Sequence, residues 1–391
     1  MRRRTLIVSV WALLLPAAAV AETSSWVGRV DGPAEPAPRK AAPKRAPPAA
    51  PAKVIRTEPA TPSAERPAIA APSPPSPPAL PSAAPAPGGT APPALPPPER
   101  ASEYAKTPAP GEDAAYEAFD QGKYVTALNL ALAAAQKGDA QAHTLVGRIY
   151  QEGYGAPQNL ALAAQWYARA AELGDPAGMF AYGLMLAEGQ GVQKNLEAAA
   201  QMFEAAARHR HALANYNLAL LFLKGQGKPE NPVRAFGHML FAAEAGIVAA
   251  QYDLGTLYAT GTGVDYNAFE AARWIGKAAA QGYPEAQLDY AVLLFRGHGV
   301  PPDQKRGAQL FRAAAEKGLP VAQNRLARCY AHGAGVEKDL VEAAKWHLIA
   351  KAAGESDEQL DKLLAKLSKA DRAKAEAAAY QWRDRTLMGI E

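Results

Sequence analysis

The sequence predicts an all-α fold: a right-handed superhelical solenoid of helix-turn-helix repeats, preceded by a disordered Pro/Ala-rich segment. A loop glycine recurs every 36 residues, and a second glycine follows each one two positions later. Small and large apolar residues form columns at the same interval. A constant period of this length indicates stacked copies of one two-helix unit. The first glycines of the six loops are Gly153, Gly189, Gly225, Gly261, Gly297 and Gly333.

The N-terminus has the layout of a secretory signal peptide. Three arginines follow the first methionine, an apolar run extends from Leu6 to Leu15, and Ala19-Val20-Ala21 has the small-x-small form of a cleavage site. We therefore expect a signal peptide over residues 1–21 and an exported chain, located in the periplasm, in the cell envelope or outside the cell. The alternative is an uncleaved signal anchor, which would be the chain's only contact with a membrane.

Residues 22–112 are expected to form a disordered Pro/Ala-rich linker. The stretch from Pro33 to Pro110 contains 25 of the chain's 34 prolines. Proline removes backbone donors and disfavours helix at the preceding residue, and few large apolar side chains are present to build a core. The linker is either a plain spacer or a stalk that carries the repeats away from a membrane or through the cell wall.

Folded sequence is expected from residue 113 onward. Residues 113–139 resemble an incomplete helix pair in repeat register and are expected to cap the N-terminal end. Six repeats are expected over residues 140–356. The frame is lost beyond Gly354, so residues 357–391 are expected to form C-terminal capping helices, with Trp382 covering the last apolar face. Caps are needed because an end unit of a solenoid has no neighbour on one side.

The first helix of each unit is predicted from two columns three residues apart. A small residue lets the neighbouring helix approach closely, and a large one fills the core stripe. The small column contains Gly147, Gly183, Ala219, Gly255, Ala291 and Ala327, and the large column contains Tyr150, Leu186, Phe222, Tyr258, Leu294 and Tyr330. The loop glycines that follow are expected to supply a positive φ or a close backbone approach.

A residue of a type preferred at N-caps precedes the second helix of each unit. These residues are Asn159, Asn195, Asn231, Asn267, Asp303 and Asp339. An alanine column further along the helix allows adjacent helices to interdigitate. The single cysteine, Cys329, falls in a column of apolar residues, so we expect it to be a small buried hydrophobe.

These columns resemble the Sel-1-like repeat family, which is related to the tetratricopeptide repeats. The unit from Ala250 to Gly282 matches the pattern of alanine, Leu-Gly, tyrosine, Gly-x-Gly-Val, an Asn cap, tryptophan and Ala-Ala-x-x-Gly. The resemblance covers residues 114–355. It implies an adaptor, since family members include periplasmic regulators of sensor kinases, envelope assembly factors and secreted proteins that bind host molecules. A branch linked to β-lactam binding or hydrolysis carries paired cysteines in each repeat, which this chain lacks.

Several function classes are disfavoured by composition and motif. Residues 112–391 carry 29 Lys plus Arg and 31 Asp plus Glu, and this balance in an exported chain argues against nucleic-acid binding. The Gly-x-Gly loops lack the preceding strand of a dinucleotide site and the lysine of a phosphate loop. The seven histidines are scattered over different repeat columns without metal-ligand spacing. We expect no catalytic, cofactor-binding or metal-binding residues, and no enzymatic activity.

The resemblance places the first helices along the concave face of the solenoid. In related domains that clamp peptide carboxylates, an asparagine occupies the column that contains Asn217. Such a face, with apolar patches and polar groups, would suit a helical or extended peptide. The alternative is that these side chains are only a solvated inner wall. The candidate partner-binding residues are Asn217, Lys224, Tyr252, Asp253, Asp289, Arg296, Arg325 and Arg328.

These observations predict a non-enzymatic periplasmic or envelope scaffold, or a regulator, that binds a partner through its concave face. The expected partner is an envelope protein, such as a membrane sensor or an assembly factor, or a peptide segment of one. The first alternative is a peptidoglycan-associated envelope protein. The second alternative is a wall-active or β-lactam-interacting enzyme.

Overall fold

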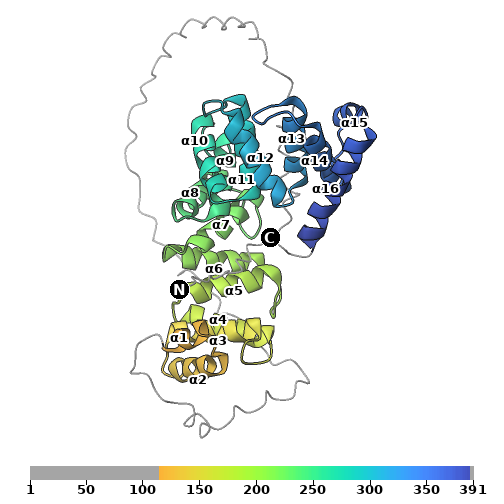
Figure 1. The fold of residues 1–391 in the computed structure, drawn as a ribbon. Coiled ribbons are helices and arrows are strands. Elements are labelled where there is room, and N and C mark those ends of the chain that lie inside the picture. The colour runs from red at the N-terminus through yellow and green to blue at the C-terminus, as the bar shows by residue number, and fades with distance from the viewer. Residues whose placement is uncertain (1–113, 388–391) are drawn as a thin grey trace, which may run out of the picture. The chain divides into compact units, whose positions relative to one another are not determined.

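The computed structural model describes residues 114–387, and every regular element within this range is an α-helix (Figure 1). The short helices α1 (Ala114–Asp120) and α2 (Tyr124–Ala135) come first. The helices α15 (Glu358–Leu364) and α16 (Lys369–Leu387) come last. The signal peptide expected over residues 1–21 and the linker expected over residues 22–112 lie outside the described residues.

Between these end helices lie six helix pairs, and each of the twelve helices has 13 residues. The all-α repeat fold predicted from the 36-residue period is therefore confirmed. The pairs are α3 (Ala140–Glu152) with α4 (Leu160–Glu172), α5 (Pro176–Glu188) with α6 (Leu196–Arg208), α7 (Ala212–Lys224) with α8 (Pro232–Glu244), α9 (Val248–Thr260) with α10 (Ala268–Ala280), α11 (Pro284–Arg296) with α12 (Gln304–Glu316), and α13 (Pro320–His332) with α14 (Leu340–Ala352).

Each second helix packs against the first helix of its own unit and against the first helix of the next one. The helices therefore follow one another along the stack (Figure 1), and the buried apolar residues form successive clusters, each shared by neighbouring helices. The small column serves close packing as expected: a Cβ at Gly183 would lie 2.7 Å from the ring of Phe203, which is fully buried. Cys329 is also buried, in agreement with its place in the apolar column.

The two loop glycines have different physical roles. Gly189 ends α5 in the left-handed conformation, with φ of 79°, and its N–H donates to the carbonyl of Met185. Gly191 also has a positive φ, and a Cβ there would lie 2.2 Å from the carbonyl oxygen of Leu160 in the preceding unit. No side chain fits at such a distance, so the loop of one unit rests directly on the backbone of the unit before it.

Helix N-termini are capped differently on the two helices of a unit. All six second helices have the predicted Asn or Asp cap; Asn195, for example, accepts from the backbone N–H of Ala198 at 2.9 Å. First helices α3, α5 and α7 are capped by the side chains of Asp139, Asp175 and His211. Helices α9, α11 and α13 follow Ile247, Tyr283 and Leu319, which form no side-chain cap.

The C-terminal helices close the apolar end of the stack. Helix α16 packs against α14, and the ring of Trp382 meets that of Trp346 edge to face at 5.7 Å. Trp382 therefore covers the last apolar face, as the sequence predicts. Helix α15 is attached to α13 by its N-cap, Asp357, which accepts from Arg328.

One position departs from the repeat pattern at the end of the second helices. Six of the seven units and caps have a glycine there, with φ between 84° and 97°, whereas the third position in the column is Arg210, with φ of 61°. A side chain in this conformation costs about 1 kcal/mol or more. The guanidinium of Arg210 lies 5.1 Å from the centre of the Phe241 ring, a contact that offsets part of this cost.

Candidate functional site

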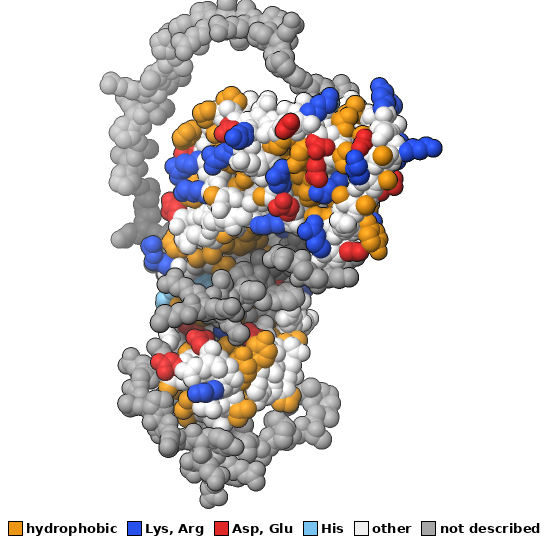
Figure 2. Space-filling view, in the orientation of Figure 1, with side chains coloured by type: hydrophobic (Ala, Val, Ile, Leu, Met, Phe, Trp, Pro, Cys, Tyr) orange, Lys and Arg blue, Asp and Glu red, His pale blue; other side chains and the backbone are white. Residues whose placement is uncertain are grey.

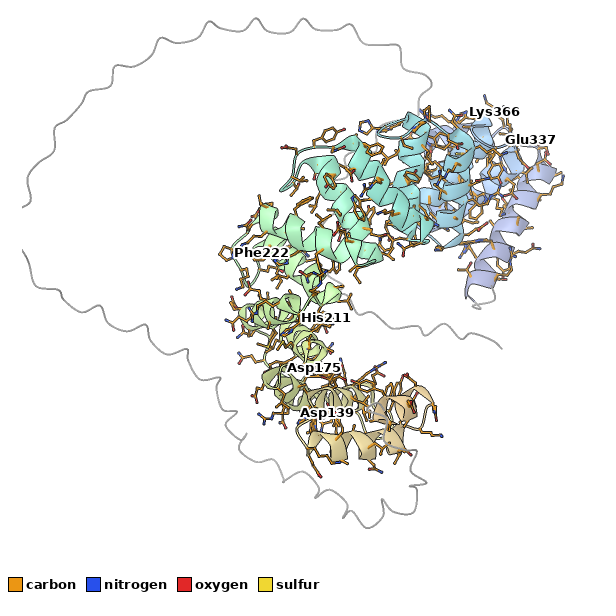
Figure 3. The ribbon with its side chains drawn as sticks, turned by 90° about the vertical axis from the view of Figure 1, so that its left-hand side faces the viewer. Asp139, Asp175, His211, Phe222, Glu337 and Lys366 are labelled. Atoms are coloured by element: carbon orange, nitrogen blue, oxygen red, sulfur yellow. The ribbon has the colours of Figure 1, made fainter. Side chains whose placement is uncertain are left out.

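Neighbouring first helices are joined directly by side-chain hydrogen bonds. Tyr216 of α7 donates to Asp253 of α9 at 3.0 Å, and Tyr252 of α9 donates to Asp289 of α11 at 2.8 Å. Thr144 of α3 donates in the same way to Asp175, the cap of α5. We call the solvent side of α3, α5, α7, α9, α11 and α13 the first-helix face; these hydrogen bonds join it between α3 and α5 and from α7 to α11. Figure 3 shows the caps Asp139, Asp175 and His211 following one another along the array.

The tyrosine–aspartate pairs place carboxylates in a partly desolvated position. Burial raises the pKa of Asp253 to about 6, while the hydrogen bond from Tyr216 and the charge of Lys224 act in the opposite direction. Burial also raises the pKa of Asp289, opposed by the hydrogen bond from Tyr252. A carboxylate kept at such a position destabilises the folded chain at neutral pH, and perturbed groups of this kind are enriched at functional sites.

Aromatic rings complete this part of the first-helix face. The rings of Tyr252 and Tyr283 lie 5.4 Å apart. Burial and the nearby Asp253 charge raise the pKa of Tyr216, and burial and Asp289 do the same for Tyr252, so both hydroxyls remain donors. The arrangement offers a half-buried aromatic surface beside two acidic groups, a combination suited to holding a polypeptide.

Basic groups gather on the next two first helices. Burial lowers the pKa of Arg325, and the charges of Arg328 and Arg296 lower it further, against smaller opposing effects of Asp357 and Glu355. Arg328 forms a 2.6 Å ion pair with the buried Asp357 through its Nε. Burial alone would raise the pKa of Asp357, but the hydrogen bonds from Arg328 and from the backbone of Leu360 bring it below its usual value. The face thus changes from acidic and aromatic at α9 to basic at α13.

The structure places the eight predicted residues in three situations. Lys224, Tyr252, Asp253 and Asp289 belong to the acidic and aromatic part, and Arg296, Arg325 and Arg328 belong to the basic part. Asn217 is only 1% exposed, and its amide donates to the carbonyl of Leu213 at 2.9 Å. Asn217 therefore offers a partner no accessible atom in this conformation, although it stands in the same column as Asp253.

Sequence reasoning missed Tyr216, Tyr283 and Asp357. Tyr216 and Tyr252 stand at the same repeat position, immediately before the column of Asn217 and Asp253, so a second column was the available signal. Asp357 lies beyond the last repeat and belongs to no repeat column, so the periodicity gave no information about it. Its role depends on how α15 folds back onto α13.

The described helices can be compared with two further kinds of functional element, a metal site and a membrane-spanning helix. Among residues 114–387, no group of three or more His, Cys, Asp or Glu side chains is placed to hold a metal ion. None of the helices in this range is both long and apolar enough to cross a bilayer. On the face visible in Figure 2, Lys, Arg, Asp and Glu side chains are interspersed over α9 to α14, while few charged groups appear over α1 to α4.

Comparisons with known proteins agree with this architecture. The family model described as Sel1 repeat matches six consecutive segments, residues 140–175, 176–211, 212–247, 248–283, 284–319 and 320–355. The matched segments make up more than half of the chain. No functionally curated protein matches the chain.

Two solved structures are similar to the described helices. The crystal structure of a Sel1 repeat protein from Oxalobacter formigenes is 29% identical, with a TM-score of 0.55, over 62% of this chain and 97% of that one. A protective antigen of uropathogenic Escherichia coli strains with an SLR fold is 27% identical, with a TM-score of 0.48, over 67% of this chain and 64% of that one. The match thus spans less than two thirds of the antigen.

Proposed function

Because this chain belongs to the Sel1 repeat family, whose members are generally protein-interaction scaffolds, we propose that it is a non-enzymatic scaffold of the cell envelope. It holds a protein partner, or a peptide segment of one, on the first-helix face. The signal-peptide layout of residues 1–21 supports export to the periplasm or the envelope. The partner is an envelope protein such as a membrane sensor or an assembly factor.

One observation carries the proposal more than any other. Asp253 is kept on the first-helix face in a half-buried position that raises its pKa to about 6, between Tyr216 and the ammonium group of Lys224. An ionised aspartate at this position costs stability, and a neutral asparagine could accept the hydrogen bond from Tyr216 without that cost. A role in contacting a partner explains why a charged group stands there.

In-cell photocrosslinking tests this proposal. A photoreactive phenylalanine analogue replaces Lys224, an exposed residue at the end of α7 on the first-helix face. The matched control replaces Lys305, an exposed lysine on the second helix α12. Position 252 is less suitable because the Tyr252 hydroxyl is bonded to Asp289.

We expect one dominant envelope protein to be captured from position 224 and absent from position 305. The charge reversal Arg325→Glu in the chain labelled at position 224 should reduce that adduct several-fold. Equal capture from both positions, or no adduct from position 224 in cells that produce the full chain, would contradict a partner on this face.

A further inference from the structure

A cavity of about 360 Å³ lies between α13 and α15, at the C-terminal end of the first-helix face. Four of its lining side chains are basic: Arg328 and His332 on α13, and Lys362 and Lys366 on and after α15. Leu360 and Leu363 provide an apolar wall. No carboxylate is among the described residues that line it. Lys366 lies at the far end of the array (Figure 3).

The acidic groups close to the cavity are already engaged or exposed to solvent. Asp357 is buried and accepts from Arg328, from Asn324 and from the backbone N–H groups of Gln359 and Leu360. Glu358 faces Lys362 at 3.7 Å, but both side chains are more than three-quarters exposed, so this pair is weak. Asp357 therefore balances the charge of Arg328, whereas the charges of Lys362 and Lys366 are not balanced by a buried carboxylate among the described residues.

The same basic stripe continues along α13. Arg325, Arg328 and His332 follow one another at intervals of three and four residues, which places them on one side of the helix. Among residues 114–387, Arg325 forms no hydrogen bond or ion pair, although burial and two neighbouring arginines lower its pKa. Within the same range, the ion pair with Asp357 engages only the Nε of Arg328, which leaves its terminal nitrogens available.

The distance between these basic groups favours one kind of ligand. Arg325 and His332 are separated by about 10 Å along the helix axis, at 1.5 Å per residue. A single small anion bound in the cavity would leave Arg325, which is not among the described residues that line it, without a partner. Several carboxylates carried on a polypeptide can contact these groups together, and an apolar side chain between them would pack on Leu360 and Leu363.

We propose that this cavity and the adjacent stripe of α13 bind an acidic peptide segment, with its carboxylates on Arg325, Arg328, His332, Lys362 and Lys366 and an apolar side chain on the two leucines. The inference rests on the proposed function, because it assigns a chemistry to the partner segment that the scaffold holds. It also extends the site beyond the repeats, since α15 supplies half of the cavity.

Fluorescence anisotropy with the full chain tests the inference directly. The probe is a labelled ten-residue peptide, Gly-Ser-Asp-Leu-Glu-Asp-Leu-Glu-Gly-Ser, compared with the same peptide in which Asn and Gln replace Asp and Glu. The cavity variant is Lys362→Glu with Lys366→Glu, since both side chains are exposed, and its far-UV circular dichroism is compared with that of the wild type to check that it folds. The control with the same change in net charge is Lys137→Glu with Lys194→Glu, two exposed lysines at the opposite end of the stack.

We expect the acidic probe to bind and the amide probe to bind at least tenfold more weakly. The cavity variant should lose at least tenfold in affinity, the control less than twofold, and added salt should weaken binding by screening. Equal losses in both variants would indicate attraction to net charge alone and would overturn the inference. So would failure of the wild-type chain to bind the acidic probe, or millimolar inorganic phosphate that binds at Lys362 and Lys366 in its place. Photocrosslinking from position 224 reports on the proposed function and peptide binding reports on the cavity, so failure of the one can be distinguished from failure of the other.

Discussion

Repeats one to three and repeats four to six use the same positions of the first helix for different purposes. One column contains Leu145, Ala181 and Asn217 in the first half, all apolar or buried, and Asp253, Asp289 and Arg325 in the second half. The helix caps show the reverse trend: Asp139, Asp175 and His211 are replaced by Ile247, Tyr283 and Leu319. In the first half, polar groups cap the first helices, whereas in the second half the first helices lack side-chain caps and carry polar groups on the first-helix face, where these groups cost stability and are available to a partner.

The largest effect is expected where the second half meets its cap. Asp357→Ala should cost about 3 kcal/mol locally, because it leaves Arg328 without its buried partner and removes the N-cap of α15. Hydrogen exchange followed by mass spectrometry should show faster exchange in α14 and α15 and no change in α3 to α6. Asp371→Ala, which removes only exposed contacts, is the control. Unchanged protection of α15 would show that Asp357 does not hold the cap in place.

The next largest effect should be a gain in stability. Asp253→Asn is expected to stabilise the chain by about 2 kcal/mol at pH 8, since an elevated pKa means that the ionised carboxylate is disfavoured in the folded state. The folded chain binds more protons than the unfolded chain between the unfolded pKa of about 4 and the folded value of about 6. The stability difference should therefore disappear as the pH falls from 6 to 4.

Thermal unfolding of both proteins across pH 4 to 8 measures this difference. Asp265→Asn is the control: it replaces an exposed loop residue and should change the melting temperature little at any pH. If the melting temperatures of wild type and Asp253→Asn change in parallel with pH, Asp253 does not destabilise the second half as proposed.

The first half should respond to pH in the opposite direction. Burial lowers the pKa of His211, against the opposing charge of Asp175, and its neutral Nδ1 accepts from the N–H of Ala214 at 3.2 Å. The unfolded chain takes up this proton more readily, so the contribution of His211 is complete above pH 6.5 and is lost as the pH falls through the lowered folded value.

His211→Asp should therefore gain about 1 kcal/mol at pH 5, because it restores an ionised cap of the kind found at Asp139 and Asp175. At pH 7.5 the gain should be close to zero, since the ring contact with Phe180 is lost. His209→Asp, which changes an exposed residue, is the control. A gain that does not depend on pH would show that protonation of His211 is not what weakens this cap.

The smallest effect is expected at the position where the first half departs from the repeat pattern. Arg210→Gly should raise stability by roughly 0.5 kcal/mol, because relief of the left-handed conformation exceeds the lost contact with Phe241. Arg208→Gly, inside the last turn of α6, should instead cost about 1 kcal/mol. Melting temperatures of the two variants that shift in the same direction would contradict this reading.

Features that depend on one unit alone could be predicted from the sequence. The first loop glycine, the Asn and Asp caps and the small column opposite Phe203 are each determined within one helix pair, and the structure confirms them. The capping role of Trp382 could also be predicted, since an exposed apolar end requires a cover.

Features that depend on the offset between units could not be predicted. Tyr216 donates to Asp253, the residue that follows its repeat equivalent Tyr252, and this contact depends on how neighbouring first helices pack. The same packing buries Asn217, although the polar residues Asp253, Asp289 and Arg325 of its column suggest an exposed position. The cavity between α13 and α15 depends on a segment outside the repeat frame, for which no periodicity exists.

The contact between Gly191 and the carbonyl of Leu160 recurs along the stack, for example between Gly227 and Leu196 and between Gly299 and Ala268. The interval from one unit to the next is therefore set by main chain resting on main chain. Substitutions on the first-helix face leave these contacts in place, because they join main-chain atoms of the loops and second helices. The spacing of the scaffold and the chemistry of its surface can thus vary independently, and new binding preferences can arise without a new fold.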